Sequence, residues 1–482
     1  MPLPLNKTKI VCTIGPASQT RDVMEKLLLA GMNVARLNFS HGDFTNHKAV
    51  IENLRAAARA TQCRLAIMAD LPGPKMRIGK FQSEPIELTP GNSFTLTTDD
   101  IIGDVHKVSV TFARLPQVVK SGDTLYLNDG LIRVDVEQVQ GSDVLCRVVA
   151  GGELRSKKGL NLPGIDLGIK AFTEHDHDCM KFALENGVDA VSQSFVENSA
   201  DIRAVRDAAA ALGYHPFIVA KIERARALNY LGDIITAADA VMIARGDLGV
   251  ELPIEQIPVV QKQIMREANM LAKPVITATQ MLESMTTSPR PTRAEATDVA
   301  NAILDGTDAV MLSGESAMGS FPVDSAAMLA RIAAAIEPYR TMISARELFR
   351  GVDLRGKVPP ARLIDLGVET VLQYSDPAAV FVPTHSGNTA RSIARFRLPI
   401  WIVAVSSQET TCQHLQFSSG VYPVFQAEHP EKWNTYVSDW LKTNGIEGKL
   451  AIVTEGPSGK HPDMNNRLDV VDLSLQAEVG RS

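Results

Sequence analysis

Four charged or hydroxyl residues, Lys221, Glu223, Asp247 and Thr279, stand at the ends of short apolar runs in the middle of the chain. Each run is rich in β-branched residues and is followed by a stretch long enough for a helix, which is typical of a strand buried on both faces. In a parallel sheet covered by helices, the carboxyl end of a strand is the first position that can carry chemistry. We therefore expect these side chains to converge on one site. The runs, with one more that ends at a serine, span residues 217–223, 240–247, 274–279 and 309–313.

The residue types at this predicted site suit a divalent cation and an anionic substrate. Glu223 and Asp247 would follow neighbouring strands, and one or two carboxylates with substrate oxygens are a common magnesium-binding set. Lys221 lies two residues before Glu223, so both side chains point to the same face of a strand. A lysine beside a metal suits a transition state that carries negative charge, as in phosphoryl transfer. Arg36 and Arg77 add positive forks for phosphate or carboxylate, although a strand-end Lys–Glu pair is also a common ordinary salt bridge.

Four similar runs occur upstream, at residues 9–14, 33–38, 65–70 and 190–195, which gives eight in all. Eight strand-then-helix units are the count of a TIM (β/α)8 barrel, the α/β fold that we predict. An open doubly wound sheet would be built from similar strands, and periodicity alone does not separate the two. The predicted helices span residues 22–30, 47–60, 175–186, 199–212, 225–231, 257–271, 293–304 and 322–336.

The chain has 482 residues, more than the roughly 250 of one barrel. The pattern of apolar and polar residues changes twice along it. Short alternating runs separated by turn pairs predict an inserted small β-barrel domain where a mobile lid would sit. After about residue 340, a basic connection and alternating strands and helices predict a C-terminal α/β domain with a mostly parallel sheet. The predicted division is a discontinuous catalytic barrel (1–70 and 170–340), a lid (71–169) and a regulatory domain (341–482).

The composition excludes several function classes. A net charge of −6 and a pI near 6.0 give no general attraction to nucleic acid or to an anionic membrane. No apolar run reaches the roughly 18 residues of a membrane span, and the first residues lack an apolar signal core. Five scattered cysteines without CxxC spacing favour buried thiols over disulfides or zinc. We expect a cytoplasmic protein.

A second candidate site lies in the C-terminal region, where a predicted strand at residues 379–382 runs into a polar loop and then a helix. Backbone N–H groups and hydroxyls at such a junction can bind a phosphate. The alternative is that the Ser and Thr residues simply cap the helix. The candidate effector residues are Thr384, Ser386, Gly387, Asn388 and Thr389.

Several segments resemble pyruvate kinase, and they occur in order over the predicted barrel and the lid boundaries. The resemblance is weaker inside the lid and weakest after residue 340. It implies a glycolytic kinase that transfers the phosphoryl group of phosphoenolpyruvate to ADP, giving ATP and the enolate of pyruvate, which is then protonated. The segments are KIVCTIGPAS (9–18), ARLNFSHG (35–42), GPKMR (73–77), KKGLNLPG (157–164), AKIE (220–223), ARGDLGVE (244–251), TATQMLESM (277–285), SPRPTRAE (288–295) and DVANAILDGTDAVMLSGE (298–315).

The resemblance implies a role for each charged residue named above. Glu223 and Asp247 would hold the Mg2+, or Mn2+, that bridges the substrate. Lys221 would neutralise the phosphoryl group in flight. Arg36 and Arg77 would orient the phosphate.

The resemblance also implies roles for backbone and hydroxyl groups. Backbone N–H groups near Gly246 and Asp247 would meet the substrate carboxylate. Thr279 would stand on the face where the enolate receives its proton, through water. Similar proteins are homotetramers in which the barrel and C-terminal domains form separate interfaces, so an effector could bias the lid and the active site.

Asn38, Ser40, Asp70 and the Leu71 carbonyl match the family's monovalent-cation site. Potassium-dependent members carry a glutamate at the position where this chain has Lys75. An ammonium group about 4 Å from its partner contributes roughly 4 kcal/mol at an effective dielectric near 20, enough to replace a loosely held cation. We therefore expect a Mg2+-dependent enzyme that needs no K+. The alternative is that Lys75 is a solvated side chain of the lid hinge.

Alternatives also exist for the effector and for the class of function. Asn388 stands where many relatives have a basic residue, which favours a sugar monophosphate or AMP as activator over a doubly phosphorylated sugar. A magnesium-dependent lyase or aldolase acting on an enolate could use the same barrel, but it would not explain the lid and the third domain. A non-catalytic sugar-phosphate sensor would be expected to lack the set of Lys221, Glu223 and Asp247, which is intact.

Overall fold

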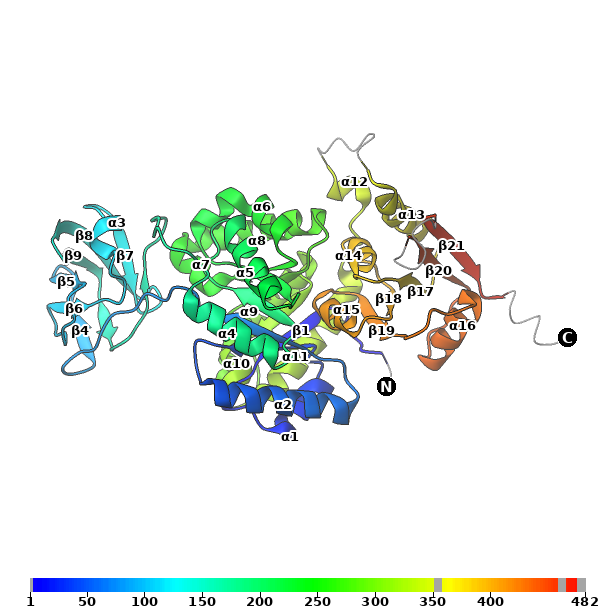
Figure 1. Ribbon diagram of the computed structural model, residues 1–482, viewed down its shortest axis with the longest axis horizontal. Helices are drawn as coiled ribbons and strands as arrows, with labels where there is room; N and C mark the ends of the chain where they lie inside the picture. The colour runs from blue at the N-terminus through cyan, green and yellow to red at the C-terminus, as the bar shows by residue number, and fades with distance from the viewer. Residues whose placement is uncertain (1–2, 351–357, 458–464, 475–482) are drawn as a thin grey trace.

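The computed structural model describes residues 3–350, 358–457 and 465–474. Three bodies lie in a row: a β-rich body at one end, a barrel in the centre and an α/β body at the other end (Figure 1). The chain leaves the barrel after β3 (Ala66–Leu71), builds the β-rich body and returns at α4 (Glu174–Glu185). The central body is therefore discontinuous in sequence.

Eight parallel strands close the barrel in the ring order β1-β16-β15-β14-β13-β12-β3-β2. Closure confirms the predicted TIM barrel and excludes the open doubly wound sheet. Almost every strand residue is buried, which explains why the runs are continuously apolar rather than alternating. Besides β3, the strands are β1 (Lys9–Thr13), β2 (Val34–Asn38), β12 (Ala190–Gln193), β13 (Phe217–Ile222), β14 (Ala240–Ala244), β15 (Val275–Ala278) and β16 (Ala309–Leu312).

Helices cover the outside of the barrel, and polar side chains fix several of their first turns. Asp43, Thr173, Asn198 and Thr292 each accept a hydrogen bond from a backbone N–H of the following helix. Each cap fixes the residue at which the loop ends and the helix begins. Besides α4, the helices are α1 (Arg21–Leu29), α2 (Phe44–Thr61), α5 (Ser199–Ala211), α6 (Leu231–Ala237), α8 (Ile257–Met270), α9 (Arg293–Leu304) and α11 (Pro322–Ile336).

Two of the predicted elements need correction. The predicted strand 240–247 ends at Ala244, and Asp247 lies in the first turn of a short helix, α7 (Arg245–Glu251). Glycine and aspartate are poor strand formers, and a carboxylate is favoured near a helix N-terminus. The predicted helix 225–231 is a 3₁₀ segment (Ala225–Tyr230) that leads into α6.

The inserted β-rich body packs around one apolar core of its own. Its strands form a six-stranded sheet in the order β11-β7-β8-β9-β5-β6 and a two-stranded sheet, β10-β4. The sequence did not predict β10 and β11, which are only three and two residues long. The strands are β4 (Ile86–Leu88), β5 (Ser93–Thr97), β6 (Lys107–Ser109), β7 (Thr124–Leu127), β8 (Ile132–Gln140), β9 (Asp143–Ala150), β10 (Gly152–Leu154) and β11 (Leu160–Asn161), with one short helix, α3 (Leu115–Val118).

The C-terminal body is a five-stranded sheet in the order β19-β18-β17-β20-β21, antiparallel only between β20 and β21. A mostly parallel sheet was the prediction, and it is confirmed. This body packs on the amino-terminal ends of the barrel strands: Lys9 Nζ at the start of β1 donates to the Val421 carbonyl at 2.8 Å, and Phe217 stacks on Phe417. The elements are α12 (Ala345–Leu348), α13 (Pro360–Tyr374), β17 (Ala379–Pro383), α14 (Asn388–Ala394), β18 (Trp401–Ser406), α15 (Glu409–His414), β19 (Val421–Phe425), α16 (Trp433–Thr443), β20 (Leu450–Glu455) and β21 (Arg467–Asp472).

Two further sequence expectations concern membranes and thiols. Within the described ranges, no helix is both long enough and apolar enough to cross a membrane. All five cysteines are free thiols, and four of them are buried, with Cys63 half-buried.

Candidate active site

The carboxyl ends of the barrel strands hold a buried charge cluster centred on Lys221. Its ammonium donates to Ser194 Oγ at 2.6 Å and lies 3.2 Å from Glu223 Oε2 and 3.5 Å from Asp70 Oδ1. Burial by itself would lower the pKa of Lys221, but the two carboxylates outweigh it and raise that pKa. The lysine is therefore held as a cation at the mouth of the barrel.

Asp70 connects this lysine to a second cation, Arg36. Arg36 donates from Nε and Nη2 to Asp70 Oδ2, at 2.8 and 2.5 Å, and from Nη1 to Thr13 Oγ1 at 2.9 Å. Ser192 donates to the other oxygen of Asp70 at 2.6 Å. Burial opposes ionisation of Asp70, but Lys221 and Arg36 prevail and lower its pKa to about 2. The result is an anion on β3 fixed between a cation on β2 and a cation on β13, with Ser192 on the intervening strand β12.

Glu223 is 3 % exposed and is oriented by the backbone of the loop that follows β12. Its Oε1 accepts from the Phe195 N–H at 2.7 Å, where Phe195 has a left-handed φ of +58°. Its Oε2 has no hydrogen-bond partner among the described residues. Burial, with a further contribution from Asp247, raises the pKa of Glu223 against the opposing charge of Lys221. A buried carboxylate oxygen with no hydrogen bond, and only the Lys221 ammonium beside it, is a group that a further cation would stabilise.

Asp247 supplies the second carboxylate from an exposed position in the first turn of α7. Neighbouring strands bring it to Glu223, since Lys221 is paired with Met242 and Ile222 with Ile243 in the barrel register. The described residues contain no group of three or more His, Cys, Asp or Glu that could enclose a metal. A divalent cation here would therefore take two protein carboxylates and complete its shell with substrate and water, which is how Mg2+ is commonly bound. The donor set fits that ion.

The next strand brings Thr279 against the start of α7. The Gly246 N–H donates to Thr279 Oγ1 at 2.7 Å, and that hydroxyl donates to the Ala278 carbonyl at 2.7 Å. Thr279 has a left-handed φ of +70°, which is unusual for a β-branched residue and indicates a backbone held by its surroundings.

Arg245, the first residue of α7, holds the turn that contains Thr279. Its guanidinium forms a bidentate pair with Asp298, at 2.8 and 2.7 Å, and donates to the Thr279 carbonyl at 2.9 Å. These bonds join the first residue of α7 to the turn after β15 and to α9. We did not predict Arg245 or Asp298 as site residues. The sequence offers a weak signal, an arginine directly before the Gly246-Asp247 pair.

Further cations face the site from the hinge that leads into the β-rich body. Arg77 donates to the Lys157 carbonyl at 3.2 Å. Lys75 is solvent-exposed, yet partial desolvation, followed by the charges of Arg77 and Lys221, lowers its pKa to about 8. The same two hinge cations, after desolvation, help to lower the pKa of His41. The site therefore has a strongly positive side.

A cleft of about 850 Å³ opens between the β-rich body and the barrel, beside Asp247. Arg245, Gly246 and Asp247 line its barrel side, and residues of the β-rich body such as Tyr126 and Arg133 line the other. The cleft is large enough for a nucleotide-sized ligand.

Of the groups predicted for a monovalent cation, Asn38, Asp70 and the Leu71 carbonyl already have partners. Asn38 Oδ1 accepts from the Ser40 N–H at 3.1 Å, and the Leu71 carbonyl accepts from Ser194 Oγ at 2.7 Å. Asp70 is held by Arg36 and Ser192, as described above. We missed Ser192 and Ser194, although their alternation in the run AVSQSF places both hydroxyls on one face of a strand.

The effector candidates lie apart from this cluster, in the C-terminal body at the opposite end of the barrel (Figure 1). Thr384 Oγ1 accepts from the Gly387 N–H at 2.9 Å, which is the turn-capping contact of the simpler alternative. Arg391, one turn into α14, donates to the Ser386 carbonyl and to Asn388 Oδ1, at 2.8 and 2.9 Å. The loop therefore has a cation close beneath it.

Fold and site together define a (β/α)8-barrel enzyme with a cluster of charged residues at the carboxyl ends of its strands and an inserted domain that faces the cleft beside them. The pyruvate kinase barrel-domain model matches residues 5–326, and the model of the pyruvate kinase alpha/beta domain matches residues 366–471. The chain belongs to the pyruvate kinase family, whose members are phosphotransferases.

Individual relatives match over nearly the whole chain. The pyruvate kinase of Thermococcus litoralis is 46% identical over 464 residues, covering 95% of this chain and 97% of that one. The pyruvate kinase of Geobacillus stearothermophilus is 42% identical over 468 residues, covering 95% and 79%. The crystal structure of a pyruvate kinase from Cryptosporidium parvum superposes with a TM-score of 0.90 at 34% identity, covering 97% and 96%.

Proposed function

We propose that this chain transfers the phosphoryl group of phosphoenolpyruvate to ADP, giving pyruvate and ATP, as a glycolytic enzyme of the cytoplasm. The observation that carries the proposal is the buried Lys221 cation, held beside the carboxylate pair of Glu223 and Asp247. This set suits phosphoryl transfer, in which negative charge moves from one oxygen to another. The protein forms no covalent bond in such a step and acts by positioning groups and stabilising charge.

Each of the charged residues then has a distinct task. Glu223 and Asp247 would hold Mg2+, which would supply positive charge to an anionic substrate. Lys221 faces the phosphoryl group in flight. Arg36 and Arg77 orient the substrate phosphate, since planar guanidinium forks match its oxygens.

Thr279 and the start of α7 would act on the carboxylate and the enolate. Backbone N–H groups at Gly246 and Asp247 meet the substrate carboxylate, and the Gly246 N–H can exchange its bond to Thr279 for one to the substrate. Thr279 then helps to protonate the enolate through water. ADP occupies the cleft beside Asp247, with the β-rich body closing over it as a lid.

A coupled assay for ADP-dependent formation of pyruvate from phosphoenolpyruvate tests the proposal directly. Pyruvate formation that requires both ADP and Mg2+ supports it. A lyase or aldolase would release product without ADP, and a non-catalytic sensor would bind sugar phosphates without turnover; either result contradicts the proposal. The lid and the C-terminal domain argue against the first rival, and the intact catalytic set argues against the second.

We also propose three domains and a homotetramer. We propose a barrel of residues 1–70 and 170–340, a lid of 71–169 and a regulatory domain of 341–482, since each has its own apolar core. The tetramer rests on family membership alone. Sedimentation analysis of the full chain measures its mass in solution, and a monomer would contradict the proposed assembly.

For the effector we propose a sugar monophosphate or AMP, bound at the loop of residues 384–389. Hydroxyls and N–H groups of the loop would take one phosphate, with Arg391 beneath it as the cation. Asn388 offers no charge for a second phosphate, and its amide oxygen is already bound to Arg391. Sigmoidal phosphoenolpyruvate kinetics should become hyperbolic with glucose 6-phosphate, ribose 5-phosphate or AMP. If fructose 1,6-bisphosphate alone shifts the curve, the inference from Asn388 is wrong.

A further inference from the structure

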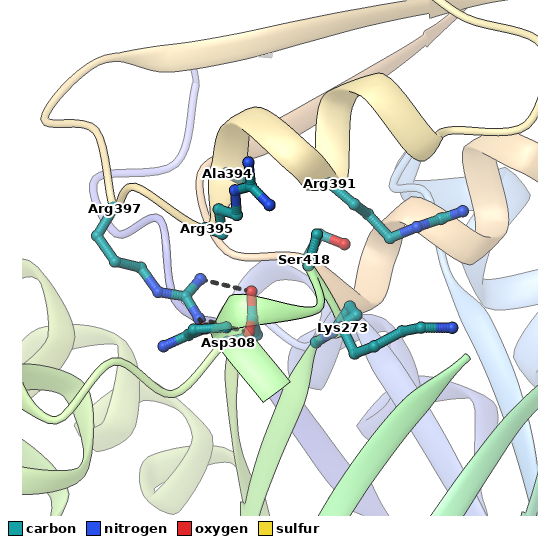
Figure 2. Close-up of a pocket in the computed structure, with 10 residues that line it drawn as sticks. Lys273, Asp308, Arg391, Ala394, Arg395, Arg397 and Ser418 are labelled. Atoms are coloured by element: carbon teal, nitrogen blue, oxygen red, sulfur yellow. Dashed lines mark hydrogen bonds and ion pairs between the residues drawn. The ribbon is translucent and has the colours of Figure 1, made fainter. Parts of the chain in front are cut away.

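The joint between the barrel and the C-terminal body contains a pocket with an excess of positive charge (Figure 2). Four of its lining residues are cations and one, Asp308, is a carboxylate. Barrel residues line one side, next to the starts of β15 and β16, and residues in and after α14 line the other. The cations are Lys273, Arg391, Arg395 and Arg397.

The one carboxylate of the pocket is already engaged by one cation. Arg397 binds both oxygens of Asp308, at 2.7 and 2.8 Å, and the Ser419 N–H donates to Oδ1 at 3.0 Å. Figure 2 shows this pair at the edge of the pocket, with Arg395, Arg391 and Lys273 on its other sides. Asp308 is therefore taken up by Arg397, and no second carboxylate lines the pocket for the other cations. Lys273 donates to the Ala238 carbonyl and Arg391 to the Ser386 carbonyl.

Several buried donors of the pocket lack acceptors. Arg395 is 2 % exposed, and none of its three guanidinium nitrogens has a hydrogen-bond partner among the described residues. Its ion-pair partner Asp365 lies outside the pocket lining, at 3.5 Å. In the same part of the chain, Nη1 of Arg391, Nε of Arg397 and Oγ of Ser418 are likewise unpartnered. Leaving a buried donor without an acceptor is unfavourable, and more so for a charged group.

An oxyanion would supply the missing acceptors. Guanidinium groups bind tetrahedral oxyanions through paired N–H donors, and burial strengthens such charge-assisted bonds. The hollow measures about 190 Å³ with its open mouth, but its free space is about that of one water molecule. A phosphate would therefore enter by displacing Arg391 and Lys273 from their bonds to the Ser386 and Ala238 carbonyls. The fit is therefore better for a small anion than for a bulky one.

We propose that this pocket binds a tetrahedral oxyanion, as inorganic phosphate or as the phosphate end of a small metabolite. The site is distinct from the active site, which lies at the other end of the barrel, and its core of Arg395 and Arg397 is distinct from the loop of residues 384–389. Because its ligand would touch both bodies, its occupancy ties the barrel to the C-terminal body.

Titration calorimetry of the full-length protein with inorganic phosphate, at constant ionic strength, tests the proposal. Arg36→Met removes the active-site phosphate contact, so the measurement is made in that background. We expect Arg395→Met to weaken the remaining phosphate affinity at least tenfold. The matched control is Arg331→Met, which removes an exposed arginine of α11 and should leave the affinity unchanged. Loss of binding in Ser386→Ala but not in Arg395→Met would assign the phosphate to the loop and overturn the proposal.

Anomalous diffraction from crystals soaked in selenate provides a test that needs no variant. A selenate peak between Arg395 and Arg397 supports the site, and peaks confined to the active site or the loop contradict it. Displacement of that peak by phosphate alone identifies the free ion as ligand, and displacement by glucose 6-phosphate identifies a monoester. Since both readouts measure binding rather than turnover, their failure would leave the proposed reaction standing.

Discussion

Lys221 Nζ lies 3.2 Å from Glu223 Oε2, although both side chains project from the same strand and are almost fully buried. The spacing of two residues places both groups on one face of β13, so each stabilises the charge of the other. The pair therefore holds an ammonium group and a carboxylate side by side at the carboxyl end of β13.

The first prediction concerns the two carboxylates. Glu223→Ala and Asp247→Ala should each remove most of the activity, because the proposed Mg2+ loses one of its two protein ligands. The fold should survive the loss of Glu223, since Lys221 keeps its contacts with Asp70 and Ser194. Steady-state turnover and the thermal unfolding midpoint measure the two effects separately.

The control for these carboxylates is Glu255→Ala, which removes an exposed acid near α8 and should change neither quantity. Wild-type turnover of either carboxylate variant over a full range of Mg2+ concentrations would contradict the metal assignment.

The second prediction concerns the lysine itself. Lys221→Met removes the charge while keeping a similar apolar volume, and turnover should fall on the order of a thousandfold or more, as expected for a lost charge stabiliser. Asp70 remains paired with Arg36, so no buried carboxylate is stranded there. Single-turnover phosphoryl transfer is the measurement. Lys181→Met, at an exposed position, is the matched control, and near-normal transfer by Lys221→Met would rule out the proposed role.

Much of the barrel could be predicted from sequence because its strands are short and apolar on both faces, as β13 and β15 illustrate. Their carboxyl ends converge by topology, so the placement of Lys221 and Glu223 followed from the pattern. The sequence predicted that Asp247 lies near the site because it would end a strand. It does lie near the site, but on the short helix α7. Pattern analysis continued the strand through Arg245 because α7 is too short to show helical periodicity.

The network around the site could not be predicted in the same way. The pair of Arg245 and Asp298 joins residues 53 positions apart, and the bond from Ser192 to Asp70 spans 122. Such contacts depend on the register of the closed barrel rather than on local spacing. The buried guanidinium of Arg395 gave no signal either, because an arginine within an amphipathic stretch is usually a solvated side chain.

The third prediction separates the two half-reactions. Thr279→Ala should slow protonation of the enolate more than phosphoryl transfer, because a hydroxyl has no charge to offer the phosphate. Exchange of the pyruvate methyl protons with deuterated water, followed by NMR, measures the first step, and single-turnover ATP formation measures the second. Thr279→Ser keeps the hydroxyl that meets Gly246 and should retain most of the exchange. Equal losses in both steps for the alanine variant would argue against the role.

The fourth prediction concerns potassium. Lys75 contributes positive charge to the same cluster as Arg36 and Lys221, and we propose that it substitutes for a monovalent cation. Activity in a tetramethylammonium buffer should therefore match activity in potassium chloride at equal ionic strength. Lys75→Glu should create potassium dependence, while Lys80→Glu, at another exposed hinge lysine, should not. A wild-type enzyme that stays nearly inactive until potassium is added would refute the substitution.

The final prediction gives that substitution a pH dependence. Partial desolvation, followed by the charge of Arg77, lowers the pKa of Lys75 to about 8, so the ammonium form predominates below pH 8 and is lost above it. The wild-type enzyme should be insensitive to potassium at pH 7 and should be stimulated by it at pH 9, where the lysine no longer supplies its charge. Lys75→Arg keeps the charge at both pH values, because a guanidinium does not titrate in this range, and should remain insensitive throughout. Turnover with and without potassium, measured at both pH values for the two proteins, decides the matter: an equal potassium response at pH 7 and pH 9 in the wild type would show that the charge of Lys75 does not occupy the cation's place.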